Sequence, residues 1–323
     1  MLIPVLLFLV GLVLLIKGGD WFVDGSTGLA HRFHIPEILI GATIVSIGTT
    51  LPEVMVSAGA AVSGHGEIAY GNAIGSIICN TSLIAALTIA IRPSKINRKP
   101  LILPVVFFFI AAVFYSLVAY FGGYFSRLAG IVLISLFAVY MFLSVKQATK
   151  SLKGLSEKEE KSDDSSGSLP KDILLLVIGA AVIAIGADLL VDNGTIIAEG
   201  LGVPESVIAL TFVALGTSLP ELVTAITALL KGHSALSLGN IIGANLFNLV
   251  LVSGVATVLS PFSIPASTQL FGINTSLVID IPVMFVVMSL LIFPALCRGK
   301  LSRVQGILLL AIYAAFCIFQ FVV

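Results

Sequence analysis

Two glutamates lie in the middle of apolar segments of this 323-residue chain. Glu53 ends the motif GTTLPE in the apolar segment 36–62, and Glu221 ends the motif GTSLPE in the segment 204–230. An acidic side chain at the centre of a membrane helix costs about 2.5–3.5 kcal/mol on insertion scales. Each glutamate is therefore expected to face the protein interior and to hold a cation or a proton.

The proline before each glutamate adds oxygen ligands to the same place. Pro52 has no N–H, so the carbonyl of Gly48 loses its helical donor and the bond to the Thr49 carbonyl is weakened. Thr49 and Glu53 are four residues apart and share one helix face, and the second motif repeats this spacing. Carbonyl, hydroxyl and carboxylate oxygens suit Ca²⁺ and Na⁺. A proline kink beside a purely structural glutamate is the alternative, which two copies of the motif disfavour.

A second pair of motifs supplies glycine and amide side chains. The segments are GNAIGSIICN, which starts at Gly71, and GNIIGANLFN, which starts at Gly239. Their glycines form small-residue stripes for close helix approach. The adjacent polar stripe at four-residue spacing consists of Asn72, Ser76 and Asn80, and of Asn240, Ala244 and Asn248. Interhelical hydrogen bonding and ion contact are equal alternatives for the first asparagine of each motif, whereas ion contact is favoured for the last.

The two halves of the chain are related by an internal repeat. With an offset of 168 residues, Gly19–Ser82 aligns with Ala187–Val250 without a gap, and 23 of the 64 positions are identical. The identical positions include Pro, Glu, Asn and Gly as well as apolar residues. Inverted repeats are typical of secondary transporters, whose substrate site lies between the repeats near the membrane midplane.

The elements that must position these residues are membrane helices. The chain is 58% apolar and 11% charged, with a mean hydropathy of +1.13, which excludes an ordinary soluble domain. About 20 apolar residues span the hydrocarbon as a helix. Ten segments qualify: 2–27, 36–62, 67–91, 100–120, 127–147, 172–198, 204–230, 235–259, 274–296 and 302–322. The sequence thus predicts an all-α polytopic membrane protein, in which five spans per repeat place the second copy in the opposite orientation.

The basic residues predict the orientation of these spans. Fifteen of the 17 Lys and Arg residues fall in the odd-numbered connections, whereas Arg127 alone falls in an even-numbered one. The positive-inside rule then makes the odd connections cytoplasmic and both termini extracytoplasmic, in a cell membrane. The expected domains are a first repeat over 1–147, a polar cytoplasmic linker over 148–171 and a second repeat over 172–323.

The paired motifs resemble the alpha repeats of the cation/calcium antiporter superfamily, and most closely those of prokaryotic sodium/calcium exchangers. The resembling segments are 41–82 and 209–250, and the ten-helix layout also agrees. The resemblance implies eight bundled helices crossed by two long tilted helices, the first and the sixth, which slide during transport. It also implies that Glu53 and Glu221 are the central ligands for Ca²⁺ and Na⁺. The residues that would complete the metal sites are Thr49, Thr50, Thr217, Ser218, Ser76, Asn80 and Asn248.

This chain departs from the family pattern at two of these positions. Well-studied members of the family carry Asp where this chain has Asn248, and Ser where it has Ala244. The first change removes a titratable group and the second removes a hydroxyl that would serve one sodium site. Both changes bear on the coupling ion and on the stoichiometry.

Antiport of Ca²⁺ against Na⁺ is therefore the leading hypothesis for function. Antiport of Ca²⁺ against H⁺ is the alternative within transport, because two buried glutamates can also carry protons. A passive cation channel is a different class, which the inverted repeat disfavours. No motif of an intramembrane enzyme is present, so we expect no enzymatic activity and no cofactor beyond the transported ions. The net charge of zero suggests no nucleic-acid partner.

Overall fold

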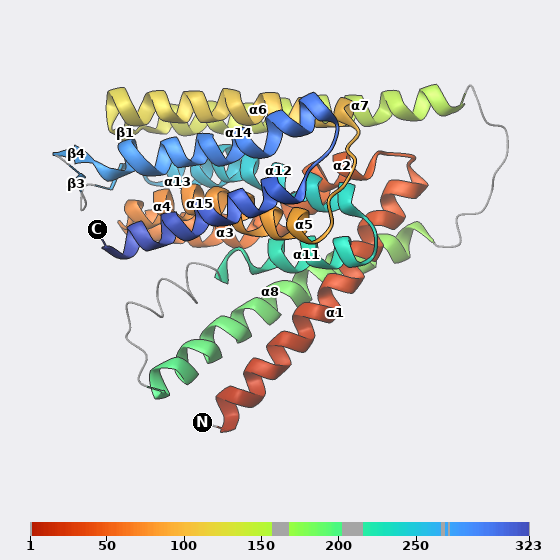
Figure 1. The fold of residues 1–323 in the computed structure, drawn as a ribbon, viewed down its shortest axis with the longest axis horizontal. Helices are drawn as coiled ribbons and strands as arrows, with labels where there is room; N and C mark the ends of the chain where they lie inside the picture. The colour runs from red at the N-terminus through yellow and green to blue at the C-terminus, as the bar shows by residue number, and fades with distance from the viewer. Residues whose placement is uncertain (1, 157–167, 202–215, 266–268, 271, 323) are drawn as a thin grey trace.

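The computed structural model describes residues 2–156, 168–201, 216–265, 269–270 and 272–322, and most of these residues are helical (Figure 1). Nine helical segments in this part of the chain are long and apolar enough to cross a membrane. Nine of the ten predicted spans are thus found as long apolar helices, which confirms the predicted all-α, multi-pass fold. The expected seventh span is represented by α11, whose 12 residues are preceded by a turn.

Several of the spans contain short π-helical segments, labelled η. In chain order the helical segments are α1 (Leu2–Arg32), α2 (Glu37–Ile40), η1 (Gly41–Val45), α3 (Ser46–Val62), α4 (Gly66–Cys79), η2 (Asn80–Ala85), α5 (Ala86–Ile91), α6 (Arg98–Leu117), η3 (Val118–Gly122), α7 (Arg127–Ser156), α8 (Leu169–Gly200), α11 (Leu219–Leu230), α12 (Ser234–Phe247), η5 (Asn248–Val252), α13 (Ser253–Leu259), η6 (Ser276–Asp280), α14 (Ile281–Arg298) and α15 (Arg303–Val322).

The two longest helices, α1 and α8, lie obliquely across one side of the bundle (Figure 1). They run antiparallel and touch through glycines. A side chain at Gly11 would meet the Gly186 carbonyl oxygen at 2.9 Å, and one at Gly25 would meet the Asp172 carbonyl oxygen at 2.6 Å. Residue numbers thus rise along α1 as they fall along α8, as expected for equivalent helices of two inverted repeats. Because the two backbones pack this closely, we call α1 and α8 together the α1–α8 unit.

The remaining helices form a bundle whose interior is built from the motif-bearing spans. In the apolar 18-residue stretch of Ser234–Leu259, 83% is buried, and in that of Gly66–Ile91, 72% is buried, compared with 22% for Leu2–Arg32. The glycines of the second motif permit this packing, because a side chain at Gly239 would meet the Ile38 carbonyl oxygen at 2.2 Å. The predicted glycine stripe is thus observed in the second copy. No described atom lies within 4 Å of such a side chain at Gly71, and its symmetry-related neighbours in 206–214 lie outside the described residues.

The ends of the bundle differ in their connections. At one end β1 (Tyr124–Phe125) pairs antiparallel with β2 (Phe262–Ser263), and β3 (Gln269–Leu270) forms a hairpin with β4 (Ile273–Asn274). Both chain termini lie toward this end in Figure 1, whereas α7 leads toward the linker at the other end.

The linker differs from the predicted range 148–171. Helix α7 continues to Ser156 and α8 begins at Leu169, so only 157–168 remains between the two helices. The helix-forming residues between Ala148 and Leu155 allow α7 to extend beyond the membrane span. At the start of α8 the Ser168 side chain accepts a hydrogen bond from the Lys171 N–H, as a helix N-cap does.

Candidate functional site

The nine predicted site residues lie on the most buried parts of the two repeats. Helix α3 carries three of them, the turn before α11 and its first residues carry three, and the ends of α4 and α12 carry the rest. These are Thr49, Thr50 and Glu53; Thr217, Ser218 and Glu221; and Ser76, Asn80 and Asn248. Eight of the nine are buried and Thr217 is partly buried.

Glu53 and Glu221 form the centre of this group. Both side chains have 0% exposure, and their carboxylates are close enough to repel each other. Neither oxygen of Glu53 has a hydrogen-bond partner among the described residues, and Oε2 of Glu221 has none either. The hydroxyl of Thr50 donates to Oε1 of Glu221 over 3.5 Å. A buried carboxylate without a partner is strongly destabilising, so a pair of them requires cations or protons.

The two prolines act differently in the two copies. Pro52 lies inside α3, as predicted, and interrupts the regular hydrogen bonds of that helix. Pro220 instead lies in the first turn of α11, after a turn at Thr217 and Ser218. The sequence predicted that this proline loosens the helix within the span 204–230, and the structure shows a complete turn between helical segments there. Proline fits the first turn of a helix, where no N–H donor is needed, and it disfavours helical backbone in the residue before it.

The break at Ser218 changes the surroundings of the second glutamate. Ser218 is the N-cap residue of α11, and its hydroxyl has no partner among the described residues. Glu221 lies in the first turn of the same helix. The partial positive charge at a helix N-terminus stabilises a carboxylate there. Glu53, in the middle of α3, lacks this stabilisation.

Two equivalent hydrogen bonds join the repeats. The Thr49 hydroxyl donates to Oδ1 of Asn240 over 3.2 Å, and the Thr217 hydroxyl donates to Oδ1 of Asn72 over 3.2 Å. For these two asparagines the sequence left interhelical bonding and ion contact as equal alternatives, and the structure places both in interhelical bonds. The symmetry is incomplete, because Nδ2 of Asn72 also donates to Ser57 over 2.8 Å whereas Nδ2 of Asn240 has no described partner.

The last asparagines of the motifs mark a change in helix type. Asn80 begins the π-helical segment η2 and Asn248 begins η5. Both side chains are fully buried, and neither the amide nitrogen nor the amide oxygen of either has a described partner. Single π-helical turns in long helices are frequent at functional sites because they release backbone groups from the regular ladder.

Sequence reasoning missed one neighbour of this group. Thr224 lies one turn beyond Glu221, is fully buried and has a hydroxyl without a described partner. Its equivalent in the first half is Val56, so the repeat comparison could not reveal it. A signal was nevertheless present, since Glu221 and Thr224 are three residues apart and share a helix face.

The unpartnered atoms around the two glutamates are mainly carboxylate, hydroxyl and amide oxygens, which are ligands for hard cations. No group of three or more His, Cys, Asp or Glu side chains that could hold a metal occurs among the described residues. The donor set is therefore two carboxylates plus neutral oxygens. Ala244, at the position of Ser76, is buried and contributes no hydroxyl.

Comparison with known proteins identifies the family. The family described as sodium/calcium exchanger protein matches residues 3–146 and 171–322. The chain belongs to this family. The sodium/calcium exchanger MaX1 of Methanosarcina acetivorans is 31% identical over 350 residues, which cover 98% of each chain. An uncharacterised membrane protein of Methanocaldococcus jannaschii is 37% identical over 307 residues, which cover 95% of this chain and 94% of the relative.

Solved structures of exchangers have the same fold. The sodium–calcium exchanger NCX_Mj, soaked with Na⁺ and Sr²⁺, superposes with a TM-score of 0.82 at 33% identity and covers 97% of both chains. The match extends over both repeats and over the oblique helices. The chain is thus a multi-pass membrane protein of an antiporter family.

Proposed function

We propose that the protein exchanges Ca²⁺ for Na⁺ by alternating access at a site between its two repeats. The observation that carries this proposal is the pair of fully buried glutamates with unpartnered oxygens, Glu53 and Glu221. The Thr50 hydroxyl of the first repeat lies 3.5 Å from Glu221 of the second, and further buried hydroxyl and amide oxygens lie on the same motifs of both repeats. Family membership supports the same function.

The charge of the site accounts for exchange. Two carboxylates balance either one Ca²⁺ or two Na⁺, so mutually exclusive occupancy couples the two ions. Glu53 and Glu221 would be the central ligands. The residues that would supply neutral oxygens are Thr49, Thr50, Thr217, Ser218, Ser76, Asn80 and Asn248.

The energetics of export favour three sodium ions per cycle. Expelling Ca²⁺ against a ~10⁴-fold gradient and ~100 mV costs about 10 kcal/mol. Each Na⁺ that enters down a tenfold gradient and the same potential returns roughly 3.7 kcal/mol. Two ions are insufficient and three suffice. The third would be bound by neutral oxygens. This chain has one hydroxyl fewer for that purpose than the family pattern, because Ala244 stands where the pattern has Ser.

The α1–α8 unit is the part of the fold that we expect to move. Its two helices pack together through glycine contacts. They meet the bundle through an apolar cluster around Phe22 and Ile183, which is separate from the main core and includes Ile40 and Ala228 of the bundle. A two-helix unit of this kind can shift against the bundle without disrupting the site. Such motion of one part against another is the usual basis of alternating access.

Calcium flux into liposomes tests the coupling ion. Purified protein in sealed vesicles is expected to take up ⁴⁵Ca²⁺ when internal Na⁺ is high and external Na⁺ is replaced by choline. A pH gradient without Na⁺ should drive no uptake. Uptake driven only by the pH gradient would establish proton antiport, and uptake without either gradient would indicate a channel.

We further infer that the odd-numbered connections and the linker are cytoplasmic. The 15 basic residues of these connections support this orientation. Two single-cysteine proteins test it, with Ser168→Cys at the linker end and Ser263→Cys at the β1–β2 end, both in a background where the three native cysteines are replaced. An impermeant maleimide applied to intact cells should label Ser263→Cys alone. Labelling of Ser168→Cys alone would reverse the orientation.

A further inference from the structure

Two connections lie against each other at the linker end of the bundle (Figure 1). One joins α5 to α6 and the other joins α14 to α15, and Lys95 pairs with Lys300 in an antiparallel bridge between them. The Ile96 N–H donates to the Gly299 carbonyl over 2.9 Å, and the Leu301 N–H donates to the Ser94 carbonyl over 2.9 Å. Backbone hydrogen bonds therefore hold together, as one surface, two segments that are more than 200 residues apart in the sequence.

This surface is densely basic. We call it the basic ridge, and its seven exposed cations are Arg92, Lys95, Arg98, Lys99, Arg298, Lys300 and Arg303. The chain contains no Asp or Glu between Glu67 and Glu157, and none after Asp280. The segments that build the ridge thus contain no acidic residue to neutralise it.

Two other cations near this end have acidic partners. Arg32 forms an ion pair with Asp172 at 3.2 Å, and Lys231 forms one with Asp24 at 2.8 Å. The exposed Lys146 and Lys171 form no ion pair with a described residue, but they are not part of the surface that the two paired connections build. No ridge cation forms an ion pair with any described residue. The positive-inside rule explains why cations gather in these connections, but it does not explain why seven remain together without counter-charges.

The ridge borders an apolar surface. Ile91 is 63% exposed, Val304 is 76% exposed and Phe293 is 56% exposed. These residues lie on the helices that the two connections join; Ile91 and Val304 directly adjoin Arg92 and Arg303 in sequence, and Phe293 lies five residues before Arg298. In a membrane they face the acyl chains, so the ridge lies at the level of the lipid headgroups.

We propose that the basic ridge binds the headgroup of an anionic phospholipid from the adjoining leaflet. A phosphodiester would lie among the Lys and Arg side chains, and its acyl chains would cover the exposed apolar side chains below. The apolar border favours a lipid over a soluble phosphate, which would use only the cations. The proposal is independent of which ions the protein exchanges.

Lipid retention tests the ridge with a matched pair of variants. Purified full-length protein is equilibrated in neutral detergent with phosphatidylglycerol or phosphatidylcholine, and bound lipid is measured by native mass spectrometry. The ridge variant is Lys95→Gln/Lys300→Gln, and the control is Lys146→Gln/Lys171→Gln, which removes two exposed cations near the same end. Each basic residue near an anionic surface contributes about fivefold in affinity.

The ridge variant should therefore bind phosphatidylglycerol roughly 25-fold more weakly, whereas the control should change less than about threefold. Equal loss in both variants would overturn the proposal, because it would mean unspecific attraction between charges. So would full displacement of the lipid by water-soluble glycerophosphoglycerol at equal concentration. Phosphatidylcholine binding should not change in either variant.

Labelling of a native cysteine beside the ridge provides a second test, which needs no substitution of a ridge cation. Cys297 is exposed and directly precedes Arg298. With Cys317 replaced by Ser, phosphatidylglycerol should slow maleimide labelling of Cys297 severalfold relative to phosphatidylcholine. Equal labelling rates in the two lipids would contradict binding at the ridge, whatever the folding of the variants.

Discussion

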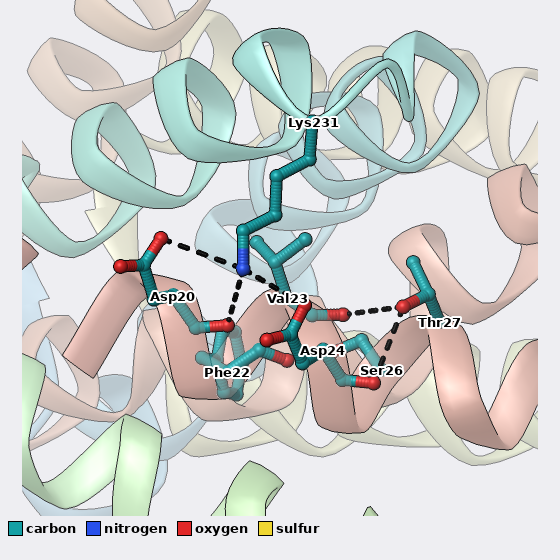
Figure 2. A network of polar contacts seen from close by, with 7 residues as sticks. All are labelled: Asp20, Phe22, Val23, Asp24, Ser26, Thr27 and Lys231. Atoms are coloured by element: carbon teal, nitrogen blue, oxygen red, sulfur yellow. Dashed lines mark hydrogen bonds and ion pairs between the residues drawn. The ribbon is translucent and has the colours of Figure 1, made fainter. Parts of the chain in front are cut away.

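Lys231 links the turn after α11 to helix α1. Its ammonium lies 2.8 Å from Oδ1 of Asp24 and 3.4 Å from Oδ1 of Asp20, and it also donates to the Asp20 carbonyl over 3.0 Å (Figure 2). The 168-residue offset places Ser63 at the equivalent position of the first repeat, and the equivalent aspartates on α8 form no ion pair with any described residue. Those aspartates are Asp188 and Asp192.

This difference between the repeats should bias the conformational equilibrium. An ion pair between the α1–α8 unit and the bundle at only one end stabilises the conformation in which that end is closed. We therefore expect Lys231→Met to reduce the population of the conformation in this structure. The bias arises from the sequence difference between Lys231 and Ser63, because the repeats are otherwise closely equivalent here.

The expected size of the effect is modest. The side chain of Lys231 is 27% exposed, and those of Asp20 and Asp24 are 38% and 54% exposed. Partly exposed pairs contribute about 0.2–1 kcal/mol each, so the two together should contribute about 1 kcal/mol. That energy corresponds to about a fivefold change in the ratio of the two conformations.

Distances between two spin labels, measured by double electron–electron resonance, can resolve such a change. Spin labels at Ile16 on α1 and Ile307 on α15, both exposed, report the position of the α1–α8 unit against the bundle in lipid nanodiscs. Lys231→Met should shift the ratio of the two distance populations about fivefold. Lys146→Met, which removes an exposed lysine from α7, should leave the ratio unchanged.

Transfer of the lysine provides the sharper test. The double variant Lys231→Ser/Ser63→Lys moves the cation to the other end, where it can approach the aspartates of α8. The distance populations should then invert relative to the native protein. If Lys231→Met and Lys146→Met give the same distribution, or if the transferred lysine has no effect, the ion pairs do not set the equilibrium.

Three further predictions concern the site and the packing. Glu53→Gln or Glu221→Gln should reduce calcium flux at least about a hundredfold in folded protein, since breaking a buried charge balance costs about 3 kcal/mol or more, and near-normal flux would remove that residue from the site. Ala244→Ser should lower the Na⁺ concentration for half-maximal exchange severalfold without changing Ca²⁺ binding in the absence of Na⁺, and an equal change for both ions would contradict a sodium-specific role. Gly179→Ala should destabilise the protein by about 1–3 kcal/mol in denaturation experiments, because its Cβ would lie 2.5 Å from the backbone of α1. The control Gly59→Ala has open space and should be neutral or stabilising.

The sequence predicted those features that depend on composition and repetition. The long apolar segments indicated membrane helices, and five predicted spans in each copy of the 168-residue repeat implied that the second copy is inverted. The buried glutamates were also predictable, because a carboxylate such as Glu53 is too costly to expose to lipid. These arguments depend on residue type and position alone.

Other features depend on contacts that no local pattern shows. Helix α11 begins at Leu219, so Pro220 lies in its first turn, although Pro52 in the same motif lies inside a helix. The π-helical turns at Asn80 and Asn248 arise from packing between helices and have no sequence signature of their own. The pairing of Lys231 with α1 joins residues more than 200 positions apart, and sequence spacing cannot predict such a contact.

Competition between the two ions for the purified protein tests the central claim most directly. Equilibrium binding of ⁴⁵Ca²⁺ should saturate at one ion per chain, and Na⁺ should displace it cooperatively whereas choline should not. Glu53→Gln and Glu221→Gln should each abolish this binding. Retention of Ca²⁺ at saturating Na⁺, or undiminished binding in either glutamine variant, would contradict an exchange site built from the two glutamates.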